Sequence, residues 1–457
     1  MGIYQVYDRK INELLLLDYK NNPYNIIDQY VKFTYTEGIL MNSIFGEIVL
    51  LDAIDFPTLL PMIGEERLKA KFTKLDHEKS SPQDYPAIEF DMQIYRMDGK
   101  NHDGGSRKRQ NYNLYFSSRF SFINMEKVVY AAYRGMKYSD MVKKIYEDYI
   151  KEDGPENKPL IVEETKFVAD LYINGKSPLD AIQDICKKSV SAEDNGSLYV
   201  FYEGRDAYHF VTIQKLLKQE PKITLHCELK NILTEGMGSD VDLKRQMTNV
   251  DSYFRNSNFD IFNSIKSGEG VSSLLTIDPI LRRYYYNEFD LRGKDKTGQD
   301  YWDKHNRISK HKPWTENNKM FANPRKNLTV SITDHEWVSD DIVTKKSSEN
   351  SSLAIDEILL HRQSMASQIQ KTIIEATLPG DPRIQAGDVV NFNVPEYLGA
   401  SFVGGAREEP DKWLNGNYLV VAVSHVVENN EYLMGLRLAR DGFSSKIFNR
   451  NPKDYSG

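Results

Sequence analysis

The chain is poor in the residues that define several common protein classes. Only two of its 457 residues are cysteines, Cys186 and Cys227, which argues against a disulfide scaffold and a cysteine-ligated zinc module. The longest apolar run, residues 418–423, is far shorter than the roughly 20 residues of a membrane-spanning helix. The N-terminus lacks the basic-then-apolar pattern of a secretion signal. These absences predict synthesis in the cytoplasm and no membrane insertion.

Basic charge is also scarce. The chain has 59 Lys and Arg against 66 Asp and Glu, a net charge of −7. A general nucleic-acid binder needs clustered basic side chains to neutralise phosphates, so this class is disfavoured. Tyrosine, in contrast, is abundant, with 28 Tyr against 4 Trp. Because tyrosine joins an apolar ring to a polar tip, it suits surfaces that contact other proteins.

Alternation of apolar and polar residues dominates residues 31 to about 125. Ile88, Phe90, Met92 and Ile94 are separated by polar residues, which is the period of a strand with one buried face. Further strands are expected at residues 67–72, 112–116, 223–229, 369–378, 388–394 and 417–427, with a hairpin return at 432–438.

Helical spacing appears mainly in the middle of the chain. Apolar residues within 138–149 recur at helical intervals, with Ser139 as the expected N-cap. A second helix is expected to begin at Ser177, which can cap it, with Pro178 at the first helical position. Residues 198–213 fit a β-turn-β unit, and residues 353–365 fit a third helix.

These patterns predict a mainly β fold with α+β parts. We expect a first β domain at residues 1–130 and a small α+β domain at 131–222. A second β domain would take residues 223–280 and 351–457, with an irregular inserted subdomain at 281–350. No fixed-period repeat is visible. A faint echo between residues 46–50 and 387–391 is too short to count as one.

The nearest approach to a phosphate-binding loop is the string at residues 170–177, which precedes a helix. A P-loop needs glycine where Asp170 stands, so a turn into a capped helix is the better interpretation. Asp334, His335 and Glu336 cannot all face one ion from a strand, because successive side chains point to opposite faces. We therefore predict no cofactor and no metal ligands.

Catalytic patterns are equally absent. No Gly-x-Ser-x-Gly string occurs, and neither cysteine stands in a catalytic context. Adjacent acids such as Glu65 and Glu66 fit a solvated face. A glycosidase needs two acids across a cleft, which sequence alone does not reveal. We predict no catalytic residues, and we keep a carbohydrate-binding or carbohydrate-cleaving protein as the alternative.

Two further features are singled out. Arg107, Lys108 and Arg109 form the one basic cluster, in the polar tip of an expected hairpin, where they are solvated or contact an acidic partner. Gly387 and Gly416 are expected in turns that need positive φ, so their role would be structural.

The order of these parts, together with several strings, resembles the central baseplate hub proteins of contractile-tailed bacteriophages of the T-even type and the related hub modules of contractile injection systems. The strings are residues 45–52 (FGEIVLLD), 60–66 (LPMIGEE), 199–204 (YVFYEG), 208–210 (YHF), 379–382 (PGDP), 386–390 (AGDVV), 416–420 (GNYLV), 424–425 (SH) and 432–441 (YLMGLRLARD). They span most of the chain.

The resemblance implies a mechanical role in the virion tail baseplate. Both β domains would be tube-like antiparallel barrels, and three chains would form a homotrimeric ring with six similar positions. Such a ring adapts the hexameric tail tube to the trimeric central spike. Expected partners are the chain itself, the spike as a separate polypeptide, and the tube or tube-initiator protein, with a tape-measure protein kept open. DNA would pass through the channel without specific binding, so Arg107, Lys108 and Arg109 are expected to point away from it.

Overall fold

The fold was analysed in a computed structural model. The structure describes residues 7–60, 62–74, 85–102, 110–151, 157–227, 246–255, 271–278, 282–290, 305–312, 327–332, 355–369, 372–394, 411, 413–428 and 431–444.

Strands make up most of the described chain. They are β1 (Arg9–Leu17), β2 (Pro23–Asn25), β3 (Tyr30–Gly38), β4 (Phe45–Asp52), β5 (Arg67–Lys74), β6 (Ile88–His102), β7 (Gln110–Ser117), β8 (Val129–Lys137), β9 (Leu160–Val162), β10 (Val168–Lys176), β11 (Tyr199–Glu203), β12 (Tyr208–Thr212), β13 (Ile223–His226), β14 (Ser252–Arg255), β15 (Val271–Asp278), β16 (Arg283–Asp290), β17 (Asn327–Ile332), β18 (Thr372–Pro379), β19 (Val389–Asn393), β20 (Gly416–Glu428) and β21 (Glu431–Arg440). The mainly β prediction is confirmed.

Helices are fewer and lie mostly in the middle of the chain. They are α1 (Phe56–Leu59), α2 (Arg119–Glu126), α3 (Tyr138–Ile145), the π-helix η1 (Tyr146–Ile150), α4 (Pro178–Lys188), α5 (Ile213–Leu217) and α9 (Ile355–Ile369). Among the described residues, no helix is both long and apolar enough to cross a membrane.

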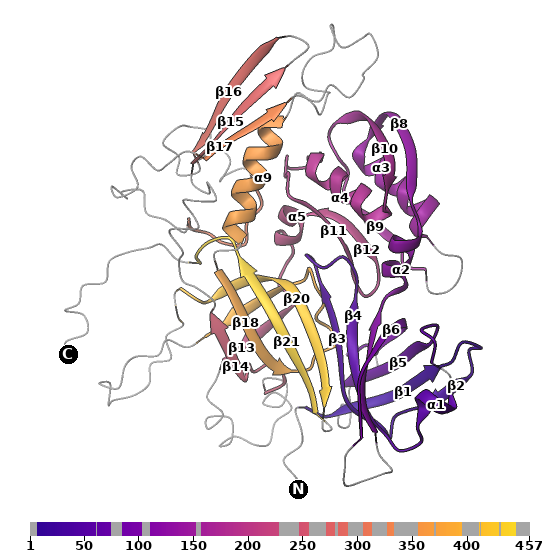
Figure 1. The fold of residues 1–457 in the computed structure, drawn as a ribbon. Helices are drawn as coiled ribbons and strands as arrows, with labels where there is room; N and C mark the ends of the chain where they lie inside the picture. The colour runs from indigo at the N-terminus through magenta and orange to yellow at the C-terminus, as the bar shows by residue number, and fades with distance from the viewer. Residues whose placement is uncertain are drawn as a thin grey trace, which may run out of the picture.

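A 13-stranded, almost wholly antiparallel sheet organises the molecule (Figure 1). Its order is β14-β18-β21-β20-β3-β4-β7-β6-β5-β1-β2, and β19 and β13 branch from β20. Two small sheets, β10-β8 and β11-β12-β9, belong to the α+β part, and a third, β16-β15-β17, packs near α9. β16 and β17 lie inside the expected insertion at residues 281–350, and both pair with β15, which precedes it. The expected domain boundaries stay a prediction.

Twelve of the 13 strands of the large sheet form two six-stranded units with the same topology, and β2 pairs with β1 at one edge. The first unit takes β1, β3, β4, β5, β6 and β7, and the second takes β13, β14, β18, β19, β20 and β21. With the strands of each unit numbered in chain order, both have the spatial order 2-3-6-5-4-1. Neighbours are antiparallel throughout, except that β13 runs parallel to β19 where β1 runs antiparallel to β5.

The two units also share their register, except that β6 has a second register shift, between Asp98 and Asn101, that β20 lacks. In each unit the fifth strand carries a β-bulge just where the fourth strand stops pairing, between Ile94 and Arg96 in β6 and between Val420 and Ala422 in β20. The pairings equate residues of the first unit with residues of the second as follows: Lys32 with Ser252, Thr34 with Phe254, Glu47 with Glu375, Tyr95 with Val421, Met97 with Val423, and Asn101 with Val426.

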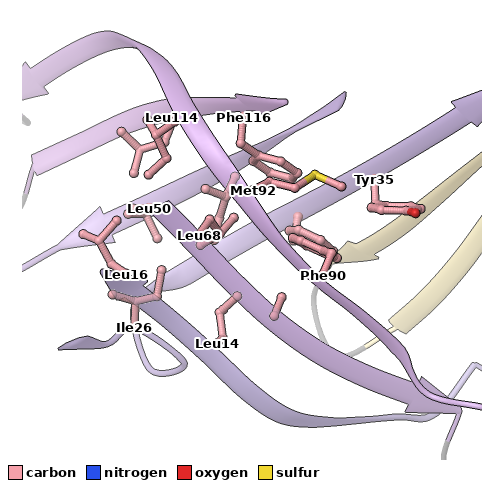
Figure 2. Close-up of a cluster of buried hydrophobic side chains, with 14 of the residues drawn as sticks. Leu14, Leu16, Ile26, Tyr35, Leu50, Leu68, Phe90, Met92, Leu114 and Phe116 are labelled. Carbon is pink, nitrogen blue, oxygen red and sulfur yellow. The ribbon is translucent and has the colours of Figure 1, made fainter. Parts of the chain in front are cut away.

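Each unit packs on an apolar core, and Val427 and Tyr432 of the second unit contribute to the core of the first. Aromatic rings dominate the core of the first unit, where Phe33 stacks on Phe90 and on Phe116 with centroids 5.5 and 5.7 Å apart. Figure 2 shows Phe90 and Phe116 among aliphatic side chains from several strands. The second unit is filled mainly by aliphatic residues such as Ile374 and Leu436. Alternation along the strands creates both cores, because every second side chain points inward.

The middle of the chain forms the small α+β part. Ser177 caps α4 by accepting a hydrogen bond from Asp180 N, which confirms the predicted start of this helix. The predicted β-turn-β unit is confirmed as β11 and β12. The expected Ser139 cap is wrong, since α3 already begins at Tyr138 and Ser139 lies buried inside it. There the Ser139 amide donates to Thr165 Oγ1 at 3.0 Å, so tertiary contacts set this end of the helix.

Candidate functional site

The two units join where β20 lies beside β3 (Figure 1). We call this pairing the junction. It runs from Ala422 opposite Gly38 to Glu428 opposite Lys32. β19 pairs with β20 only up to Leu419. The backbone groups on that edge of the remainder of β20 are therefore free to pair with β3. The result is one continuous sheet built from both units.

A buried ion pair ties the junction to the α+β part. The Arg205 guanidinium, in the turn between β11 and β12, lies 3.4 Å from the carboxylate of Glu37 on β3. It also donates to the carbonyl oxygens of Pro382 at 2.5 Å and Ile384 at 3.0 Å. Ala386 N donates to Glu37 Oε1 at 3.3 Å. One guanidinium thus holds residues from the first unit, the α+β part and the second unit together.

The charge state of this pair follows from its burial. Both side chains are almost completely buried. Burial raises the pKa of Glu37, and the positive charge of Arg205 opposes that rise. A carboxylate here costs free energy unless Arg205 stays beside it. The pair therefore stabilises the fold only when β3, the turn after β11 and residues 382–384 are packed together.

A second ion pair lies nearby. Lys158 Nζ lies 2.6 Å from Glu203 Oε1 at the end of β11. The other carboxylate oxygen of Glu203 accepts from Ser118 Oγ at 2.5 Å and from Ile44 N at 3.3 Å. This carboxylate connects the α+β part to the first unit, so both ion pairs fix the same arrangement.

A histidine and a tyrosine that lie within hydrogen-bond distance near the junction are buried inside the protein. His425 Nδ1 lies 2.8 Å from Tyr432 Oη, and both side chains are fully buried. Burial, and then the charge of Arg205, hold the pKa of His425 well below its usual range. A neutral imidazole without access to solvent cannot exchange protons with a substrate, so this pair has a packing role.

Other buried carboxylates are occupied by backbone and hydroxyl donors. Asp52 accepts from the amides of Ile54, Asp55 and Phe56 at 2.7 to 2.9 Å. Glu163 likewise accepts from Thr212 N and from Ser191 Oγ. Within the part of the chain that the structure describes, no three His, Cys, Asp or Glu side chains gather as a metal site would require.

Both singled-out glycines have positive φ, 91° at Gly387 and 135° at Gly416. A Cβ on Gly387 would lie 2.4 Å from Tyr202 Oη, and one on Gly416 would lie 3.2 Å from Arg440 Nη1. Gly387 N donates to Val420 O at 2.8 Å, just before the bulge of β20. Arg107, Lys108 and Arg109 lie outside the described residues, as do Asp334, His335 and Glu336.

Neither the Glu37–Arg205 pair nor the exposed aromatic residues of the α+β part are among the features predicted from the sequence. Tyr130 on β8 and Tyr172 on β10 are strongly exposed, and so is Met125 on α2. The signal for the two tyrosines lay in the alternation of these strands, where every second residue faces away from the core. The signal for the ion pair was absent, because its partners lie 168 residues apart.

Comparisons with known proteins identify fold relatives only. No family model matches the chain, and no curated protein matches its sequence. A tail protein from Neisseria meningitidis has 10% sequence identity and a TM-score of 0.51, and the match covers 96% of this chain and 98% of that one. The 43 kDa tail protein of a Shewanella oneidensis prophage has 8% identity and a TM-score of 0.53, with 94% and 99% covered. At these identities the likeness shows the fold, and it extends over nearly the whole chain.

Proposed function

We propose that this chain is the structural hub of a contractile phage tail. Three copies form a ring that adapts the hexameric tail tube to the trimeric central spike and leaves a channel for DNA. The observation that carries the proposal is the pair of six-stranded units with one topology and one register. Three chains with two units each present six similar positions to a six-fold tube, while the ring as a whole keeps three-fold symmetry.

Three further observations support the proposal. The fold relatives are tail proteins, matched over almost their full length. The strings of the hub-like sequence pattern include β4 in the first unit and most of β21 in the second. The buried ion pairs hold the two units and the α+β part in one arrangement, as a load-transmitting adaptor requires.

The proposed partners follow from this role. The six similar units would contact the tail tube or its initiator protein, and the central spike would bind the three-fold side. A tape-measure protein is a further candidate. The location would be the baseplate of the virion tail, after synthesis in the cytoplasm of a bacterial host. The T-even type hub is the family we favour, on the residues that carry the resemblance.

Acidic residues at equivalent positions of the two units support a channel wall that does not bind DNA. Glu47 on β4 and Glu375 on β18 occupy the same position in the two units, on the sheet face that points away from the cores. If this face lines the channel, a trimer presents a ring of six equivalent carboxylates. These six carboxylates would repel phosphates. Arg107, Lys108 and Arg109 would then point away from the channel, which stays a prediction.

The mass of the purified full chain in solution tests the proposal. We expect light scattering to give three times the chain mass of 52.8 kDa for the chain alone, or three copies of the chain in a complex with the products of the neighbouring genes. A monomer under both conditions would contradict the ring. Release of sugars from bacterial cell walls by the pure chain, abolished by one Asp or Glu substitution, would favour the carbohydrate-cleaving alternative.

A further inference from the structure

We infer that the ring closes by strand pairing between chains, with the second half of β6 of one chain lying antiparallel to β14 of the next. This contact would repeat, between chains, the junction that β20 and β3 form within the chain. The inference rests on the proposed ring and adds to it the strands and the register that would close it.

One edge of β6 has no partner among the described strands over the second half of the strand. β5 pairs with β6 only from Ile88 to Gln93. From Ile94 to His102, β6 pairs with β7 on one side and with no described strand on the other. The equivalent part of β20 pairs with β3. After the same bulge, β6 therefore offers an edge like that of β20, with one extra irregularity between Asp98 and Asn101.

β14 provides the complementary edge, because the described sheet ends at this strand. β14 is the last strand in the order of the described sheet, and it pairs there with β18 alone. It is the equivalent of β3, whose far side pairs with β20. Each chain thus carries one complete junction, between β20 and β3, and the two halves of a second one, on β6 and on β14. Two different patches that fit each other give a head-to-tail contact, which closes into a ring when the rotation allows.

Side-chain exposure supports the same pairing. Val421 and Val423, at the junction, are 8% and 0% exposed. Their equivalents on β6, Tyr95 and Met97, are 50% and 40% exposed. On the opposite edge Phe254 is 63% exposed. Large apolar side chains along an unpaired sheet edge favour association with another chain. A neighbouring copy that pairs with this edge would bury these side chains.

The equivalence also predicts the register. Within the chain, Val426 lies opposite Thr34. Their equivalents are Asn101 and Phe254, so Asn101 of one chain should lie opposite Phe254 of the next. Residues directly opposite each other in an antiparallel pair have Cα atoms about 4.5 to 5.5 Å apart. That separation lies within the range of about 4.4 to 6.8 Å in which a disulfide forms.

Cysteine cross-linking of the full chain tests the pairing. We expect the double variant N101C/F254C to form disulfide-linked dimers and trimers on oxidation, because each chain offers both halves of the contact. The single variants N101C and F254C should stay unlinked alone, and their mixture should stop at the dimer. The matched control T34C/V426C, at the equivalent positions of the junction, should form its disulfide within one chain and leave the mass unchanged.

The outcomes separate this inference from the proposed function. A trimer by light scattering whose N101C/F254C form fails to cross-link, while T34C/V426C is fully oxidised, would overturn the strand pairing and leave the ring standing. Linked dimers from either single variant would overturn the head-to-tail contact, since they require two identical patches to meet. A chain that stays monomeric with and without the products of the neighbouring genes would contradict both.

Discussion

Gly387 is a residue whose backbone conformation and surroundings both exclude a side chain. Its φ is 91°, and a Cβ would lie 2.4 Å from Tyr202 Oη. Gly387→Ala should therefore lower the free energy of unfolding by the strain of a left-handed conformation, about 1 to 2 kcal/mol, plus about 1 to 3 kcal/mol of overpacking. Urea denaturation measures the loss, and Gly387→Val should also reduce folding yield.

Gly64 supplies the matched control. Its φ is 98°, and a Cβ there would have no neighbour within 4 Å. Gly64→Ala should therefore show the backbone strain alone. Equal losses in the two variants would mean that Tyr202 moves aside without cost, and the structural role assigned to the Gly387 turn would be reduced to its φ.

Removing Arg205 should leave the buried carboxylate of Glu37 without its cationic partner. Breaking one partner of a buried ion pair costs about 3 to 5 kcal/mol, so Arg205→Met should lower the free energy of unfolding by that amount at neutral pH. The double variant E37L/R205M removes both charges and should recover most of the loss. A double variant as unstable as R205M would contradict the assigned pairing.

The same variant predicts a pH dependence. Burial raises the pKa of Glu37 above its ordinary value of 4.5, and losing Arg205 raises it further. The folded chain then binds the proton more tightly than the unfolded chain, so stability falls as pH rises through the window above 4.5. The deficit of R205M relative to the parent chain should shrink toward acidic pH and grow toward neutral pH in parallel urea titrations.

At the scale of the element, the sequence contains enough to place most strands and the start of α4. Ser177 followed by Pro178 specifies a helix start by local chemistry alone, and Ser177 does accept from Asp180 N. Ser177→Ala should therefore cost about 1 kcal/mol of stability, whereas Ser177→Gly should cost only a few tenths. Thermal unfolding of the two variants checks this ranking, and equal losses would mean that tertiary packing sets the helix start.

The repeat of the two units could not be found in the sequence. The faint echo joins residues 46–50 of β4 with residues 387–391, which reach into β19. The pairings instead equate β4 with β18, and β19 with β5. Strand topology constrains only which positions face the core, so equivalent sites accept different side chains. Gly46, for example, stands where the second unit has the buried Ile374.

The buried ion pair could not be predicted for a related reason. Glu37 and Arg205 become neighbours only when β3 and the turn after β11 are packed together. Alternation and capping are local signals, whereas this contact depends on the complete fold. Sequence reasoning could name the turn at Gly387, because a glycine before an apolar strand carries its own signal.

At the scale of the whole molecule, the proposed channel predicts how the ring responds to added charge. Reversing both equivalent acids, in E47K/E375K, would place six lysines around the trimer. We expect this variant to bind DNA in low salt and to release it steeply as salt rises, because bound phosphates displace counterions. An E375K variant alone should show the smaller effect of three added lysines. Unchanged DNA binding in the filter or gel-shift assay would place this sheet face away from the channel.

The central claim is that two like units per chain build a ring with six similar positions. Electron microscopy of the assembled particle tests it most directly. The account predicts three chains around one axis, six β barrels of like shape surrounding a channel, and a continuous sheet that passes from β6 of one chain to β14 of the next. A particle in which the two units of a chain take dissimilar places, with only one of them at the channel, would contradict it.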